Sequence, residues 1–274
     1  MPVSALLLAL AAAVVHASWN LLLSGTEDTH SASAVAIVVG TLVFLPVAII
    51  GWRFSSSAVP YVAASSALES IYLVLLATAY SVAAMGFVYP IARGSAPVLV
   101  LIAGAVVTGT RVSGIAAAGV LLVATGIVLV RGVRQAGRPR DLALALSVGV
   151  CIAGYTLVDK HGIAHANPLA YLEVVFGLTA TVYVLGVWRI RGAARLRAAV
   201  SWKTMLAGVG FFGSYALTLA ALRLAPAASV AAVRESSVVM AAAALAIGGR
   251  EEMGPARFAG AAIVVAGIAL ISLG

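Results

Sequence analysis

Long apolar runs follow one another along almost the whole chain, and short polar connectors separate them. The stretch from Gly86 to Gly109 contains one charged residue, Arg93, and the stretch from Phe258 to Gly274 contains none. A helix that spans the hydrocarbon core of a bilayer needs about 20 mostly apolar residues. Several runs reach that length, so the pattern predicts a polytopic integral membrane protein.

We predict an all-α fold with ten transmembrane helices. Inside lipid, every backbone N–H and C=O group must be satisfied within its own segment or within a closed barrel. The runs are uniformly apolar rather than alternating, which excludes the barrel. The predicted spans are residues 3–23, 33–52, 59–80, 84–108, 114–131, 142–160, 168–188, 203–223, 227–248 and 255–273.

The first run has one feature of a signal peptide, because Val15-His16-Ala17 resembles a cleavage site. A signal peptide also needs a positively charged region before its apolar core, and no Lys or Arg precedes Leu6. We therefore expect the first run to be a retained helix.

Composition supports the membrane prediction and excludes other classes. The chain is 63% hydrophobic and 9% charged, too little charge to cover a soluble domain. Most of the arginines behind the net charge of +8 lie in short connectors, where basic residues face lipid headgroups rather than nucleic acid. Cys151 is the single cysteine, and motifs for ATP binding, zinc proteolysis and serine hydrolysis are absent from the sequence. We expect no enzyme activity, no cofactor and no metal site.

The chain repeats itself at a distance of 141 residues. Matches without a gap include Gly119 with Gly260, Gly126 with Gly267, and the intramembrane Arg93 with Arg234. Five spans per half is an odd number, so the halves must enter the membrane in opposite senses, as in many secondary transporters. We predict two inverted five-helix repeats over residues 1–131 and 142–274, joined by a basic connector over 132–141.

Three strings in the chain are similar to those of a known family. They are His16-Ala17-Ser18-Trp19-Asn20, Tyr89-Pro90-Ile91-Ala92-Arg93-Gly94-Ser95-Ala96-Pro97 and Tyr155-Thr156-Leu157-Val158-Asp159-Lys160. Over its whole length the chain resembles the EamA-type ten-helix members of the drug/metabolite transporter superfamily. Where that family often has a Glu after the fourth helix, this chain has Thr110-Arg111, and its second half has Glu251 and Glu252. The resemblance implies transport of a small organic solute, usually export, and names no substrate.

Charged residues at membrane depth mark the candidate site. A charge at the bilayer centre costs about 2.5–3.5 kcal/mol on insertion scales, and Glu69, Arg93, Arg234 and Glu235 all lie well inside predicted spans. One interpretation is that they neutralise one another, Glu69 with Arg93 and Glu235 with Arg234 or across the halves. The other is that they line a cavity that binds a charged or zwitterionic solute. Both hold if the pairs open during transport.

Other candidates surround these charges. His16 and Asn20 lie one turn apart on the first helix, where they form either an interhelical hydrogen bond or a cavity wall. Pro90 and Pro97 flank Arg93 and predict a helix break, tolerated where the freed carbonyls face protein or a wet cavity. The predicted substrate-binding residues are Glu69, Arg93, Arg234, Glu235, His16, Asn20, Trp19, Tyr72 and Tyr215. Asp159 and Glu173 lie near predicted span ends and receive no role.

We predict a secondary-active transporter in the inner or plasma membrane that works by alternating access, with proton coupling through Glu69 or His16 as an option. The alternatives are a flippase of a lipid-linked metabolite, an intramembrane transferase and a non-transporting scaffold. A transferase needs a cluster of acids and histidines at one interface, and a scaffold has no use for paired arginines at the midplane. The sequence leaves open whether two copies form a homodimer.

Two arguments on orientation conflict. The family resemblance implies that both termini lie in the cytoplasm. With ten spans, four basic residues fall on the side of the termini and eleven on the opposite side. Short connectors are where the positive-inside rule applies, so the charges predict that the termini lie outside.

Overall fold

The computed structural model describes residues 1–23, 26–82, 85–131, 138–247 and 254–274. The predicted connector over 132–141 lies mostly outside these residues, as do Glu251 and Glu252. In the described part the regular elements are helices, which agrees with the all-α prediction. They are α1 (Val3–Leu23), α2 (Thr29–Ile50), the 3₁₀ turn η1 (Ser56–Ala58), α3 (Val59–Val82), α4 (Met85–Thr108), α5 (Gly114–Arg131), α6 (Pro139–Gly162), α7 (Pro168–Ala198), α8 (Trp202–Leu224), α9 (Ala227–Arg234), α10 (Ser237–Ile247) and α11 (Pro255–Leu273).

Nine segments in the described part are long and apolar enough to cross a membrane, and α5 is a shorter apolar helix. Large apolar side chains cover the outside of the bundle, for example Ile50, Val106 and Val107. An apolar surface of this extent is stable in lipid rather than in water. The chain is therefore a multi-pass membrane protein.

Local signals set the helix ends. The Asp28 side chain accepts a hydrogen bond from Ser31 N and caps α2, which starts the helix before the predicted residue 33. Pro139 and Pro168 begin α6 and α7, where the missing proline N–H is harmless. α7 continues past the predicted residue 188 and changes direction at Gly192, whose φ of 79° favours glycine.

The ninth predicted span, 227–248, is interrupted in its middle. α9 ends at Arg234 and α10 begins at Ser237. Between them Ser236 N bonds to Val233 O and Val238 N to Glu235 O, the i→i+3 pattern of a 3₁₀ turn. α4, by contrast, continues through Pro90 and Pro97 as one helix. The helix break predicted from Pro90 and Pro97 in the fourth span is therefore wrong. The structure has a break in the ninth span instead, beside the buried charges.

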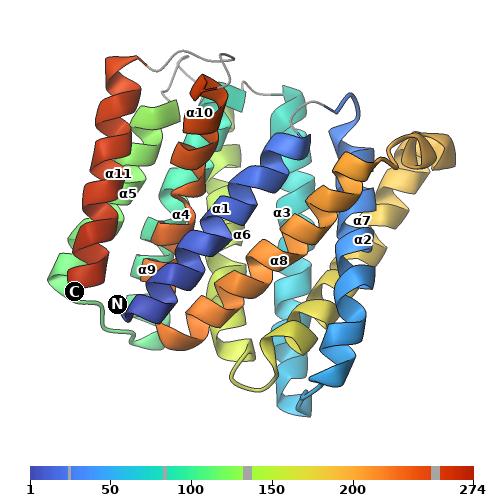
Figure 1. Cartoon of the computed structure of the whole chain (residues 1–274), viewed down its shortest axis with the longest axis horizontal. Helices are drawn as coiled ribbons and strands as arrows, with labels where there is room; N and C mark the ends of the chain where they lie inside the picture. Colours follow the sequence, from blue (N-terminus) through green and yellow to red (C-terminus); the bar gives the residue numbers. More distant parts are fainter. Residues whose placement is uncertain (24–25, 83–84, 132–137, 248–253) are drawn as a thin grey trace.

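The helices pack in reciprocal pairs (Figure 1). α5 packs against α11 at one end of the bundle and α2 against α7 at the other, while α1 packs against α8 and α3 against α6. A Cβ added at Gly119 would meet Gly267 O at 2.6 Å, and one at Gly126 would meet Gly260 O at 2.7 Å. Residue numbers rise along α5 as they fall along α11, so these two helices are antiparallel.

Candidate solute-binding cavity

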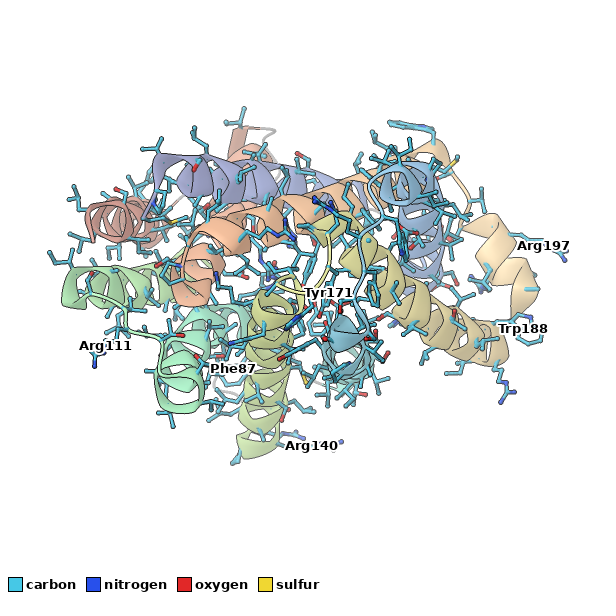
Figure 2. The ribbon with its side chains drawn as sticks, turned by 90° about the horizontal axis from the view of Figure 1, so that it is seen from below. Phe87, Arg111, Arg140, Tyr171, Trp188 and Arg197 are labelled. Carbon is cyan, nitrogen blue, oxygen red and sulfur yellow. The ribbon has the colours of Figure 1, made fainter. Side chains whose placement is uncertain are left out.

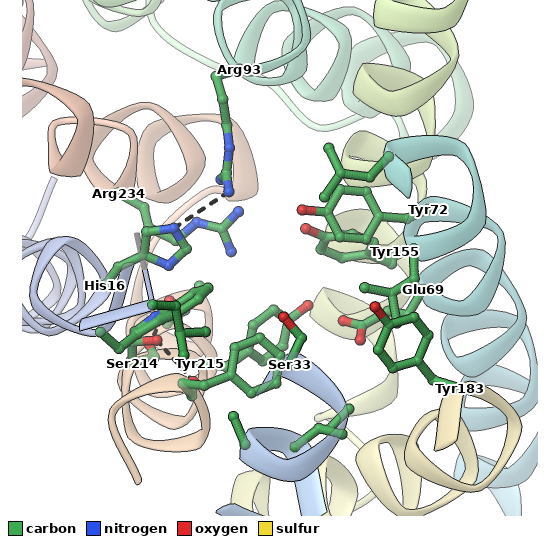
Figure 3. A pocket seen from close by; sticks show the side chains of 18 residues that line it. His16, Ser33, Glu69, Tyr72, Arg93, Tyr155, Tyr183, Ser214, Tyr215 and Arg234 are labelled. Carbon is green, nitrogen blue, oxygen red and sulfur yellow. Dashed lines mark hydrogen bonds between the residues drawn. The ribbon is translucent and has the colours of Figure 1, made fainter. Parts of the chain in front are cut away.

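A cavity of about 130 Å³ lies inside the bundle, large enough for several water molecules or a small solute. It extends from the middle of the spans toward the face opposite the termini, because Leu23 at the end of α1 and Ser33 near the start of α2 both line it. Most of its lining surface is apolar, and polar side chains from several helices also reach it (Figure 3). Those polar and charged lining residues are His16, Ser33, Glu69, Tyr72, Arg93, Tyr155, Tyr183, Ser214, Tyr215, Thr218 and Arg234.

One wall of the cavity is cationic. Arg93 of α4 and Arg234 of α9 are 8% and 5% exposed, and both reach the cavity beside His16 of α1. Arg93 Nη2 lies 3.4 Å from His16 Nε2. The two arginines are 141 residues apart in the sequence, so each predicted repeat contributes one of them to this wall.

Glu235 lies behind this wall rather than in it. Its Oε1 lies 3.1 Å from Arg93 Nη1 and 3.5 Å from Arg234 Nη2, and the residue is 1% exposed. Two guanidinium groups thus share one carboxylate, which leaves a net positive charge on the wall. The 3₁₀ turn between α9 and α10 is the backbone feature that places Glu235 between the two arginines.

The opposite wall carries hydroxyl groups and one carboxylate. Tyr72, Tyr155 and Tyr183 line it together with Glu69, which is 6% exposed (Figure 3). Among the described residues, no basic side chain lies within ion-pair distance of Glu69. The proposed pairing of Glu69 with Arg93 is therefore wrong: Arg93 pairs with Glu235 across the predicted halves, and Glu235 also contacts Arg234.

Aromatic rings frame the cationic wall. Trp19 packs edge-on against His16 and Phe211, with ring centroids 4.9 and 5.2 Å apart. Arg234 Cζ lies 5.9 Å from the centre of the Tyr215 ring, within the range of a cation–π interaction. Trp19, Tyr72 and Tyr215 thus all line the cavity, where an apolar part of a solute would contact them.

Asn20 is not brought to the cavity. Its Nδ2 donates a hydrogen bond of 2.8 Å to His16 O within α1, and its side chain is not part of the lining. Asn20 does lie one turn from His16, but its amide forms a hydrogen bond within α1. Asn20 is therefore not a wall residue of the cavity.

Asp159 is a buried acid that the sequence interpretation left aside. It is 0% exposed, and it accepts hydrogen bonds from Tyr171 OH at 2.9 Å and from Tyr215 OH. Because α6 continues to Gly162, Asp159 lies inside the protein rather than at a wet span end. The signal that could have found it is Tyr155, four residues earlier on the same helix face.

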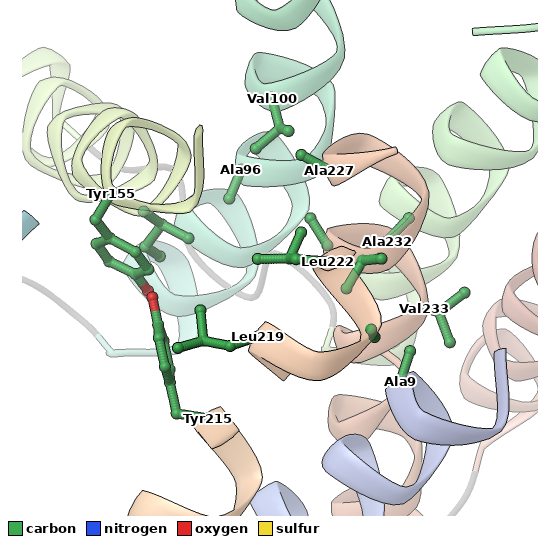
Figure 4. Packing of buried hydrophobic residues seen from close by; sticks show 14 of the residues in the cluster. Ala9, Ala96, Val100, Tyr155, Tyr215, Leu219, Leu222, Ala227, Ala232 and Val233 are labelled. Carbon is green, nitrogen blue, oxygen red and sulfur yellow. The ribbon is translucent and has the colours of Figure 1, made fainter. Parts of the chain in front are cut away.

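The far end of the cavity is closed by apolar packing (Figure 4). Leu219 and Leu222 of α8 are fully buried near Ala96 and Val100 of α4. Lys160 Nζ bonds to the carbonyls of Leu222 and Ala225 on the same side. The cavity is thus separated from the face that carries the termini.

No cluster of three metal-binding side chains occurs among the described residues. Charged side chains outside the bundle point away from it, as Figure 2 shows for Arg111, Arg140 and Arg197, whereas Tyr171 lies within it. The cavity is therefore the place where the described structure brings buried charges of both signs, Glu69, Arg93 and Arg234, to one space.

Comparison with known proteins gives one family and one fold. Residues 141–273 match the model of the EamA-like transporter family. A solved structure described only as "Crystal structure of protein" has a TM-score of 0.80 at 18% identity, covering 100% of this chain and 98% of its own; at that identity the likeness concerns the fold alone. No curated protein matches the chain.

Proposed function

Because this multi-pass membrane protein carries an EamA-like transporter family domain and its apolar helices fit the drug/metabolite transporter superfamily, we propose that it is a secondary-active transporter of a small zwitterionic organic solute. The observation that carries this proposal is the cavity with Arg93 and Arg234 on one wall and Glu69 on the other. We further propose that it works as an exporter in the inner or plasma membrane.

The charge arrangement supports a solute with two opposite charges. A carboxylate of the solute matches the guanidinium groups of Arg93 and Arg234, since such pairs form strong charge-assisted hydrogen bonds. An ammonium group matches Glu69 on the opposite wall. The rings of Trp19 and Tyr215 offer contact for the apolar part between these charges.

The reciprocal packing supports alternating access between two inverted repeats. Under the 141-residue shift Gly119 corresponds to Gly260 and Gly126 to Gly267, and the observed contacts pair Gly119 with Gly267 and Gly126 with Gly260. This exchange of partners is what a two-fold axis in the membrane plane would produce. The Arg93–Glu235 ion pair joins the two proposed halves, so it is the contact we expect to open and close during transport.

Proton coupling is part of the proposal, with Glu69 and His16 as the candidate carriers. Glu69 lies in the cavity without an ionic partner among the described residues. His16 lies beside Arg93, so a proton on the imidazole would add positive charge to the cationic wall. The wall would then repel a cationic group of the solute more strongly and attract an anionic group more strongly.

The test is uptake into proteoliposomes of an α-amino acid, its N-acetyl derivative and its amide. A zwitterion site predicts that removing either charge from the solute lowers uptake at least tenfold. Arg93→Ala should abolish uptake of the amino acid and the N-acetyl compound alike, with the protein still in the membrane. Near-normal uptake by Arg93→Ala and Glu69→Gln would contradict the proposal.

A further inference from the structure

A second, larger hollow lies between α2, α3 and α7, outside the central cavity. Its volume is about 400 Å³, and it runs from the middle of the spans to their ends at the face opposite the termini. Its lining includes His30, Ser70, Val74, Tyr183, Gly186 and Arg191. We call it the lateral groove.

Two side chains separate the lateral groove from the central cavity. Leu73 and Tyr183 line both spaces, so one layer of side chains divides them. The Tyr183 hydroxyl lies 3.1 Å from His30 Nδ1, and Figure 3 shows Tyr183 beside Glu69 on the wall of the cavity. A rotation of the Tyr183 side chain away from His30 would therefore join the two spaces.

The long wall of the groove is apolar and faces lipid. Val74 on α3 is 63% exposed, and Val182 and Ile190 on α7 are also exposed to the hydrocarbon side. A chain of methylene groups can lie along such a wall in place of a lipid tail, so the choice of occupant depends on the polar end of the groove.

The upper end of the groove is polar. Arg191 pairs with Asp28 at 3.3 Å, yet its side chain remains 43% exposed, and His30 lies beside it in the groove lining. Burial of Asp28 would raise its pKa, but the hydrogen bonds from Ser31 and the charge of Arg191 outweigh burial and lower the pKa. Asp28 therefore remains ionised and holds Arg191 at the rim, where its free edge can meet an anionic headgroup.

We propose that the lateral groove binds a single-chain amphiphile with an anionic head, with the head at Arg191 and His30 and the chain along α3 and α7. From there an amphiphile that also carries an ammonium group passes Leu73 and Tyr183 into the central cavity, so the transporter takes such solutes from the membrane, whereas a simple anion such as dodecanoate enters the cavity weakly. The entry step rests on the proposed function of the cavity, whereas binding in the groove does not.

The probe for this proposal is dodecanoate that carries a photoreactive diazirine near the end of its chain. Irradiation of the full chain in phosphatidylcholine liposomes, followed by peptide mass spectrometry, should give adducts on residues 70–78 and 182–191, and a smaller set near Tyr155. Arg191→Gln should reduce the groove adducts at least threefold, and a diazirine-bearing dodecanol should label the groove several-fold less than the acid.

Gly186→Phe provides the decisive variant. A Cβ at Gly186 meets no atom within 4 Å, so the phenyl ring fills the groove without a clash at its base. Gly177→Phe is the matched control, because Gly177 also has open space and lies nine residues away, on the opposite face of α7. Gly186→Phe should remove at least four-fifths of the groove and cavity adducts, and Gly177→Phe should retain them.

Two results would overturn the proposal, and a third would overturn its entry step. The first is labelling spread over the lipid-facing surface and unchanged in Gly186→Phe. The second is competition by phosphatidylglycerol but not by dodecanoate, which would assign the groove to ordinary lipid. The third, which removes the entry step alone, is loss of groove adducts with the adducts near Tyr155 intact. Because labelling needs no turnover, loss of the proposed transport activity would leave these results interpretable. If Gly186→Phe does not reach the membrane, Ser70→Phe fills the groove from α3 and decides the same outcomes.

Discussion

Arg93 of α4 and Glu235, at the end of α9, form an ion pair with Nη1 and Oε1 3.1 Å apart, although 142 residues separate them in the chain. Both side chains are buried, and the pair connects the two halves that the sequence repeat predicts. A buried ion pair is weak evidence for stability, because desolvation of both charges offsets their attraction. Because the pair lies between the predicted halves and beside the cavity, we expect it to serve transport rather than stability.

Removing Glu235 alone should damage the protein more than removing the whole pair. Glu235→Leu leaves the guanidinium groups of Arg93 and Arg234 buried without a carboxylate, and we expect a loss of about 3–5 kcal/mol in the free energy of unfolding. The double variant Arg93→Met/Glu235→Leu should recover part of that loss, because only Arg234 then stays buried without a carboxylate, and it should still fail to transport. Denaturant unfolding in micelles measures this, with the outward-facing Arg140→Gln as control; an unchanged stability of Glu235→Leu contradicts it.

Glu69 should matter for transport and little for stability. No basic group pairs with it among the described residues, so Glu69→Gln removes a charge from the cavity wall without exposing an unpaired cation. We expect uptake to fall at least tenfold while the unfolding midpoint changes by only a few degrees. Glu173→Gln is the matched control, since Glu173 is also a buried acid but does not line the cavity. Equal losses of uptake in both variants would remove Glu69 from the site.

Close packing of α5 on α11 should make two glycines equally sensitive. A Cβ at Gly119 would meet Gly267 O at 2.6 Å, and one at its repeat partner Gly260 would meet Val130 N at 2.7 Å. Gly119→Ala and Gly260→Ala should each cost about 1–3 kcal/mol through overpacking. Gly177→Ala, which meets open space, should instead stabilise its helix by about 0.5–1 kcal/mol. A neutral Gly119→Ala, or a large difference between the two sensitive variants, would argue against the reciprocal packing.

The two tyrosines that bond to Asp159 should separate structure from function. Tyr171 OH donates to Asp159 Oδ1 but does not line the cavity, whereas Tyr215 OH donates to Oδ2 and its ring lines the cavity. Each Tyr→Phe change leaves a buried carboxylate with one fewer donor, which costs about 1–3 kcal/mol. Solute affinity should weaken in Tyr215→Phe only, as measured by the solute-induced shift of the unfolding midpoint. A weaker affinity in Tyr171→Phe of the same size would assign both to structure alone.

The sequence predicted the positions of the helices and the buried charges, because both depend on residues close together in the chain. Apolar runs predicted the helices to within a few residues, except where the Asp28 cap and the Gly192 turn extended α2 and α7. In the described part nine segments are long enough to span a membrane, α5 is shorter, and the ninth predicted span is divided into α9 and α10. The cost of charge at depth identified Arg93, Arg234 and Glu69 as residues that need a polar environment, and all three line one cavity.

Contacts between distant segments were beyond the reach of the sequence. The sequence predicted that Glu235 pairs with Arg234 or across the halves, and both contacts occur, but nothing near Glu235 in the chain singled out Arg93 of α4. No proline marks the 3₁₀ turn that positions Glu235. Asn20 was misplaced because its amide finds an acceptor in its own helix. Asp159 was missed because its helix ends two residues later than the hydropathy pattern suggests.

Orientation in the membrane is the remaining prediction, and it rests on the charges of the connectors. Four basic residues lie on the side of the termini and eleven on the opposite side, where Arg189, Arg191, Arg195, Arg197 and Lys203 follow one another without an acidic residue between them. The positive-inside rule puts that face in the cytoplasm and the termini outside. Although the resembling family usually has the opposite arrangement, an inverted repeat permits either. A reporter that is active only in the periplasm should therefore be active when fused after Gly274 and silent when inserted after Val200. A silent fusion at Gly274, together with activity of a cytoplasmic reporter at the same point, would reverse the orientation and make the cavity described above open to the outside.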